Sequence, residues 1–171
     1  MLSVMSLLYI LGKKNKYYLI TWQVIENIQE TNQMENIDII SPWIEKAELS
    51  SPNGEFRVEY PDGSEIAMGA PTSGSLYLYW NQKKKVISYR AGASFIWSSD
   101  SKYLAYSEWT KHNSQIVKVM RMHDMNDKIG SSELRVIQFV SFESSIIKAI
   151  DSPIYMPVKI EIDILKIFME I

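Results

Sequence analysis

The residues best suited to proton transfer or metal binding are two histidines, His112 and His123. They lie in the polar stretches KHNSQ and RMHDMND, and His123 is followed by Asp124 and Asp127. A histidine beside a carboxylate can form a catalytic pair, but no G-x-S-x-G nucleophile motif and no third group accompany this one. The spacing also differs from that of zinc sites and of HExxH helices. We therefore predict no catalytic residues and no metal site.

Two other short stretches carry residue types that bind anions, but neither has the context that such a site needs. GAPTSGS, at Gly69–Ser75, lacks the lysine and the strand–loop–helix setting of a phosphate loop. KKK, at Lys83–Lys85, is a single basic triplet in a chain whose net charge is −2. One triplet is not the basic stripe of a nucleic-acid-binding protein. We therefore predict two hairpin connections, no cofactor, no nucleic-acid partner and no enzymatic activity.

Charge is unevenly distributed along the chain. Residues 26–65 contain ten acidic residues and only two basic ones, Lys46 and Arg57. Such a stretch is either a solvated acidic face or a docking surface for a basic protein. The docking interpretation selects four partner-binding residues, which are Glu55, Glu59, Asp62 and Glu65.

Length and composition indicate one globular domain. A chain of 171 residues can bury a substantial core, and the absence of cysteine excludes disulfides, thiolate metal sites and cysteine nucleophiles. The apolar run Leu2–Leu11 is shorter than the roughly 20 residues that cross a bilayer, and no positive charge precedes it. We predict a cytoplasmic protein that does not associate with a membrane.

The pattern from Lys46 onward predicts short β-strands separated by turns. Apolar and polar residues alternate in runs rich in aromatic and β-branched side chains, without long helical segments between them. This arrangement is typical of an antiparallel all-β fold. The predicted strands are 55–60, 64–69, 75–80, 85–90, 94–97, 103–108, 115–122, 134–139, 146–150 and 158–164.

The chain divides into an N-terminal segment, residues 1–45, and a β domain, residues 46–171. Within the first segment, Tyr18–Glu30 fits either one short helix or a strand, and an acidic loop follows it. Near the end of the chain, Pro153 and Pro157 bracket three apolar residues, Ile154–Met156. Prolines at these positions predict an extended segment or a turn there.

Two stretches of the β domain share one pattern. LSSPNGEFRVEY begins at Leu49 and IWSSDSKYLAYS begins at Ile96, with Ser51 aligned to Ser98 at an offset of 47 residues. Each has an apolar strand end, a small polar turn, one charged residue and an alternating strand. Offsets of this size indicate repeated structural units.

Both copies resemble the S-P-D-G-K turn of WD-like β-propeller blades, the kind found in the Tol-system periplasmic propeller and in prolyl oligopeptidase propellers. The resemblance implies two blade-like repeats that start near residues 49 and 96. The second copy departs from the pattern because it has Ser99 and Ser101 in place of proline and glycine. Two repeats cannot close a ring, which takes roughly four to eight blades. The chain is thus an incomplete propeller, a sandwich of two packed sheets or a unit that pairs with another copy, and we favour packed sheets.

The turns have a structural explanation that needs no ligand. Asn53 and Asp100 can accept hydrogen bonds from nearby backbone N–H groups. Trp97 and Tyr103 flank the second turn and can pack between sheets.

These features favour a non-enzymatic protein-binding module. Its most concrete form is a bacterial immunity or antitoxin-like protein that binds and masks a toxin, because aromatic anchors in acidic surroundings suit a basic toxin domain. The alternative is a propeller fragment or accessory domain of a Tol-like or peptidase-like system without independent activity. The sequence leaves the oligomeric state open.

Overall fold

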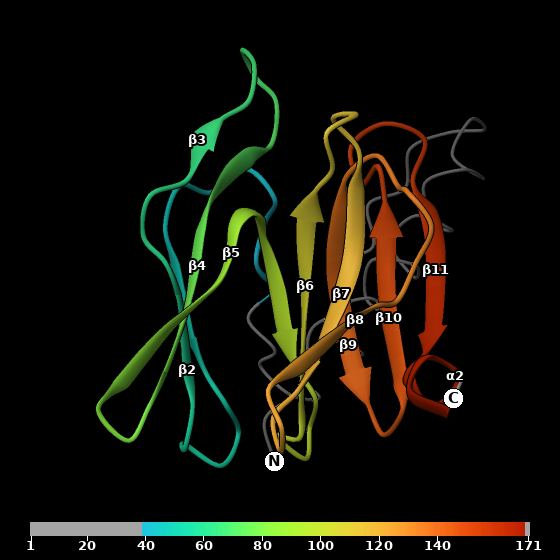
Figure 1. Ribbon diagram of the computed structural model, residues 1–171. Helices are drawn as coiled ribbons and strands as arrows, with labels where there is room; N and C mark the ends of the chain where they lie inside the picture. The colour runs from blue at the N-terminus through green and yellow to red at the C-terminus, as the bar shows by residue number, and fades with distance from the viewer. Residues whose placement is uncertain (1–38, 170–171) are drawn as a thin grey trace, which may run out of the picture. The chain divides into compact units, whose positions relative to one another are not determined.

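The computed structural model describes residues 39–169, which form strands and one short helix (Figure 1). The all-β prediction is confirmed. The first elements are β1 (Ala47–Ser50), β2 (Arg57–Tyr60), β3 (Ser64–Glu65), β4 (Thr72–Trp80), β5 (Lys83–Trp97) and β6 (Tyr103–Trp109). They are followed by β7 (Gln115–Arg121), β8 (Asn126–Ile129), β9 (Ile137–Glu143), β10 (Ile146–Asp151), β11 (Val158–Asp163) and α2 (Ile164–Met169).

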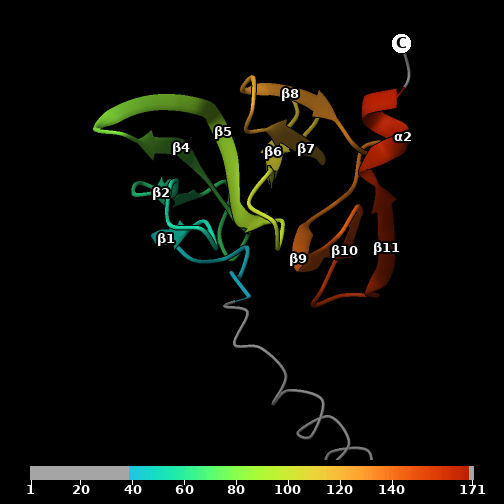
Figure 2. The same cartoon turned by 90° about the horizontal axis from the view of Figure 1, so that it is seen from below.

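The larger sheet has the order β1-β2-β4-β5-β6-β7-β8, with β3 paired to β4, and all its pairs are antiparallel. Its long strand β5 belongs to two groups of strands. The first part pairs with β4, and the last part, Phe95–Trp97, pairs with β6 after a register shift. Figure 2 shows β5 curving between these groups. Apart from the two-residue strand β3, the sheet therefore consists of two antiparallel four-stranded groups that share β5.

The smaller sheet has the order β11-β10-β9. Strand β9 lies against β5, where the Phe139 amide donates to Ser94 Oγ at 3.0 Å and the Ser99 amide donates to the Phe142 carbonyl at 3.1 Å. Helix α2 follows β11 directly and reaches β8, where Lys128 Nζ donates to the Ile167 carbonyl at 3.2 Å. The edge of β8 is thus partly covered by α2.

Two hydrophobic cores explain why the strands around Phe95 are so apolar. One core contains Phe95 and Trp97 with side chains of β2, β4 and β6, and the other contains Ile96 with side chains of β7, β9, β10 and α2. Successive residues of a strand point to opposite faces. The end of β5 is therefore buried on both faces, and its sequence is apolar at consecutive positions.

The two similar turns found in the sequence have the same hydrogen bonds. In the second turn the Ser98 amide donates to the Tyr103 carbonyl, the Ser98 hydroxyl to Asp100 Oδ1, and the Lys102 amide to Asp100 Oδ1 at 3.1 Å. In the first turn the bonds run from Ser51 N to Phe56 O, from Ser51 Oγ to Asn53 Oδ1 and from Glu55 N to Asn53 Oδ1 at 3.1 Å. The roles predicted for Asn53 and Asp100 are confirmed.

The turns also contact each other. The Asn53 amide donates to Ser101 Oγ at 3.0 Å, and Trp97 Nε1 donates to the Leu49 carbonyl at 3.2 Å. Ser101 adopts φ 61° where the first turn has Gly54 at φ 71°. A non-glycine residue in this conformation is uncommon, and its buried side chain is held by the neighbouring turn.

Several expectations about elements differ from the structure. Residues 85–90 and 94–97 belong to one continuous strand, because β5 bends instead of ending. The range 64–69 pairs only at Ser64–Glu65, because Gly69 at φ 72° and Pro71 turn the chain before β4. Strands β1 and β8 and helix α2 were not predicted. The stretches predicted as hairpin connections are partly strand, because β4 begins at Thr72 and β5 at Lys83. Tyr18–Glu30 lies outside the described residues.

Candidate functional site

In the larger sheet, the stretch Pro61–Ala70 combines exposed acidic side chains with exposed apolar ones, and we call it the β3 arm. It contains β3 and the loop that follows, and Figure 1 shows this loop extending beyond the end of β4. Its carboxylates, Asp62 and Glu65, are exposed, and it contains no lysine or arginine. Ile66 is 44% exposed and Met68 is fully exposed. The arm therefore presents two apolar side chains beside two negative charges.

Hydrogen bonds fix the conformation of the β3 arm. Asp62 Oδ1 accepts from the Ser75 amide at 3.0 Å, and Glu65 Oε2 accepts from the Gly69 amide at 2.9 Å. Trp43 Nε1 donates to the Gly69 carbonyl at 3.1 Å. These bonds order the carboxylates before any partner binds, which lowers the conformational entropy that binding has to overcome.

A hollow of about 300 Å³ lies beside the β3 arm. It is lined by residues of the arm, of the segment before β1, of the loop before β9 and of the loop after β10: Trp43, Gly69, Arg135, Val136, Ser152, Ile154 and Tyr155. Aromatic, apolar and arginine side chains of this kind are enriched in protein interfaces. The hollow could take an apolar side chain of a partner that contacts the arm.

The structure does not bring the four predicted partner-binding residues together. Asp62 and Glu65 lie in the β3 arm, whereas Glu59 lies in β2 and Glu55 in the turn between β1 and β2. Glu59 is bound by Arg57 at 2.8 Å, and Glu55 Oε2 accepts from Asn53 Nδ2 at 3.0 Å. The acidic stretch is therefore divided between at least two places.

Cations surround Glu59, so this part of the sheet is not uniformly acidic. Arg57 also binds Glu48 at 3.2 Å, and its guanidinium lies 4.8 Å from the centre of the Tyr79 ring. Lys84 Nζ lies 3.9 Å from the centre of the Tyr77 ring on the neighbouring strands. Within residues 39–169, Glu59 is the one of the four predicted residues that forms an ion pair, so Glu55 and the two carboxylates of the β3 arm are not compensated by a cation there.

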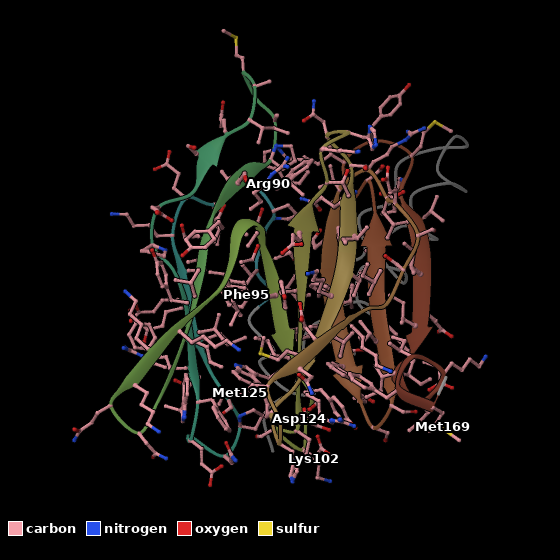
Figure 3. All side chains as sticks on the ribbon, in the orientation of Figure 1. Arg90, Phe95, Lys102, Asp124, Met125 and Met169 are labelled. Atoms are coloured by element: carbon pink, nitrogen blue, oxygen red, sulfur yellow. The ribbon has the colours of Figure 1, made fainter. Side chains whose placement is uncertain are left out.

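The histidines are exposed and lie in turns. His112 is in the turn between β6 and β7, and His123 is in the turn after β7. Arg121 binds both carboxylate oxygens of Asp124, which lies at the lower end of the molecule in Figure 3, and holds the pKa of that carboxyl well below its usual range. Within residues 39–169, no group of three or more His, Cys, Asp or Glu side chains is placed to hold a metal ion.

A polar cluster around the buried Tyr106 was not found from the sequence. The Tyr106 hydroxyl donates to Asp127 Oδ2 at 2.9 Å, and Lys118 Nζ lies 3.0 Å from the same oxygen and 3.2 Å from Glu108 Oε1. Burial, followed by the charge of Asp127, raises the pKa of Tyr106 well above its ordinary value. Tyr106 and Glu108 lie in β6, Lys118 in β7 and Asp127 in β8, so the three strands must pair before these residues meet, and no local motif results.

We expect stability to fall at alkaline pH because of two tyrosines. Burial raises the pKa of Tyr60 to about 12 and raises that of Tyr106 as well, while an unfolded tyrosine titrates near 10. Above pH 10 the unfolded chain loses these protons first, so the free energy of unfolding decreases as pH rises through 10 to 12.

Urea unfolding at several pH values from 8 to 12 tests this expectation. A Tyr106→Phe variant should lose stability less steeply above pH 10, whereas Tyr155→Phe, at an exposed tyrosine, should follow the parent protein. Equal slopes for all three proteins would contradict it.

Comparisons with protein-family models, with curated proteins and with solved structures gave no match. The described part of the chain contains no helix that is long and apolar enough to cross a membrane.

Proposed function

We propose that this protein is a non-enzymatic binding module for another protein, and that the β3 arm is its docking element. The most concrete form of the proposal is a bacterial immunity or antitoxin-like protein that masks a basic toxin domain. The observation that carries it is the arm itself, where the exposed carboxylates of Asp62 and Glu65 and the exposed side chains of Ile66 and Met68 lie in one short segment.

Charge and shape both support this use of the arm. Two ordered carboxylates without a neighbouring base in the arm attract a cationic surface and accelerate association with it. The exposed apolar side chains of Ile66 and Met68 in the same segment supply apolar area that is removed from water when a partner covers it. A projecting segment with these properties suits a cleft lined by lysine and arginine, such as the active site of an enzyme that cleaves nucleic acid.

The first test measures how fast the protein binds its candidate partner, the product of the adjacent gene. The variant removes the negative charges of the arm. The double variant Asp62→Asn, Glu65→Gln keeps an oxygen that can accept the bonds from Ser75 and Gly69 but removes both charges. We expect its association rate to fall by about tenfold at low salt and much less at high salt. Glu143→Gln, at an exposed position at the end of β9, is the matched control.

Met68→Ala tests the apolar part of the site. We expect a faster dissociation rate with little change in association rate, because short-range packing acts after the encounter. The proposal would be wrong if the adjacent gene's product does not bind, if it binds without loss of toxicity, or if the arm variants bind as the parent does.

The second proposal is an accessory domain of a Tol-like or peptidase-like propeller system. It is favoured by the two four-stranded groups whose first turns share one set of hydrogen bonds. This proposal expects the chain to bind a larger protein that contributes further blades, and it expects no toxin to be neutralised.

A further inference from the structure

The edge of the smaller sheet differs from the other sheet edges. The β9 edge of this sheet lies against β5. In the larger sheet, the β1 edge strand accepts a hydrogen bond from Trp97 Nε1, and α2 covers part of the β8 edge. Strand β11 pairs with β10, and no other described residue pairs with its opposite edge. Figure 1 shows β11 as the outermost strand of its sheet. An uncovered edge of six residues is a ready template for another strand.

Apolar side chains are exposed at both ends of β11. Met156 and Val158, where the strand begins, are 69% and 57% exposed, and Leu165 and Met169, in the helix that follows it, are 50% and 74% exposed. Figure 3 shows Met169 beyond the end of β11. Large side chains exposed at both ends of one free edge indicate that this edge becomes covered.

The sequence of β11 is complementary to itself in an antiparallel pair. It reads VKIEID from Val158 to Asp163. When Ile160 of one copy faces Ile160 of another, Lys159 of each copy faces Glu161 of the other. In the same register Val158 faces Ile162. Directly opposed residues of antiparallel strands share a face, so the two charged pairs lie together on one face and the apolar pairs lie on the other.

We propose that two copies of this chain associate through β11 about a two-fold axis, which joins their smaller sheets into one six-stranded sheet. The interface is isologous, because each copy contributes the same edge. The register places the exposed start of β11, with Met156 and Val158, alongside the end of the other β11, where α2 with Leu165 and Met169 begins. The same contact thereby pairs the free backbone groups, both charged residues and the exposed apolar side chains.

Sedimentation equilibrium and a charge exchange test this proposal on the full chain. We expect a species of twice the 19.8 kDa chain mass at high protein concentration. Lys159→Glu places like charges opposite each other at two symmetric positions, and we expect it to weaken dimerisation by about tenfold. The double variant Lys159→Glu, Glu161→Lys restores opposite charges in this register and should restore dimerisation. Lys111→Glu, at an exposed position in the turn between β6 and β7 and outside the proposed contact, is the control.

Cysteine crosslinking tests the register itself, because the natural chain contains no cysteine. Ile160→Cys should form an intermolecular disulfide on oxidation, since this position faces itself. Val158→Cys should not, whereas the double variant Val158→Cys, Ile162→Cys should. A single-chain mass at all concentrations, a charge exchange that fails to restore the dimer, or protection of the β11 amides in a monomer by residues 1–38 would each overturn the proposal.

The β11 interface does not depend on the β3 arm. The Asp62→Asn, Glu65→Gln variant should therefore dimerise as the parent does, and Lys159→Glu should bind the product of the adjacent gene at the parent's rate.

Discussion

Replacing Trp97 by alanine is expected to lower the free energy of unfolding by about 3–5 kcal/mol. The side chain is 5% exposed and lies in the first core, with its ring centre 6.0 Å from that of Phe56. Its Nε1 donates to the Leu49 carbonyl at 3.2 Å. This bond connects the second turn to β1, the strand that precedes the first turn. Alanine removes the packing, leaves a cavity and deprives a β1 carbonyl of its donor.

Two variants separate these contributions in urea unfolding experiments. Trp97→Phe keeps most of the apolar area but removes the N–H donor, so we expect a loss of about 1–2 kcal/mol. Trp43→Ala, at a tryptophan that is only half-buried and outside both cores, should cost less than Trp97→Ala. A loss below about 1 kcal/mol for Trp97→Ala would show that this residue does not hold the two turns together.

The repeated turn was the part of the fold that could be predicted most precisely. Its signal is local, because Ser98 and Asp100 bond to backbone groups within five residues. The sequence also identified the position where the second turn lacks a glycine, and Ser101 adopts the left-handed conformation there. What could not be predicted is that Ser101 bonds to the first turn, because that contact joins residues 48 positions apart.

The bend of β5 shows why strand boundaries could not be found from the pattern. Arg90, near the bend in Figure 3, and the small residues after it resemble a loop in sequence. In the structure Ala91, Gly92 and Ala93 are buried in the strand, because neighbouring strands approach closely there. The small residues at 91–93 therefore reflect close packing between neighbouring strands. A single sequence does not distinguish this from a turn.

The candidate site was predicted only as a property of composition. An excess of acid between residues 26 and 65 identified the right region, but strand pairing decided which carboxylates are compensated. Glu59 meets Arg57 two residues away, and the tyrosines of β4 bring further cations to it through register. Asp62 and Glu65 meet no such cation, because neither β3 nor the strand that it pairs with, β4, contains a lysine or arginine. The exposure of Met68 has no local signal at all.

Replacing Gly92 by alanine is expected to cost about 2–4 kcal/mol, because Gly92 lies where the two sheets are joined. A Cβ there would lie 2.4 Å from Ser107 Oγ and 2.7 Å from Gln115 Nε2. Gln115 is fully buried, and its Oε1 accepts from the Ile137 amide of the smaller sheet at 2.7 Å. Moving Gln115 to make room would leave that amide unpaired, which carries much of the expected cost.

A double-mutant cycle in urea unfolding distinguishes this clash from a general effect of glycine replacement. Ser107→Ala removes the nearer of the two atoms, so the double variant Gly92→Ala, Ser107→Ala should be more stable than the sum of the single losses predicts, by about 1 kcal/mol. Gly54→Ala is the matched control, because its Cβ would meet nothing within 4 Å and only its φ of 71° is unfavourable. Additive losses in the cycle, or equal losses at Gly54 and Gly92, would mean that the junction of the sheets tolerates a side chain. The close approach of Ser107 and Gln115 would then not be the reason for glycine at this position.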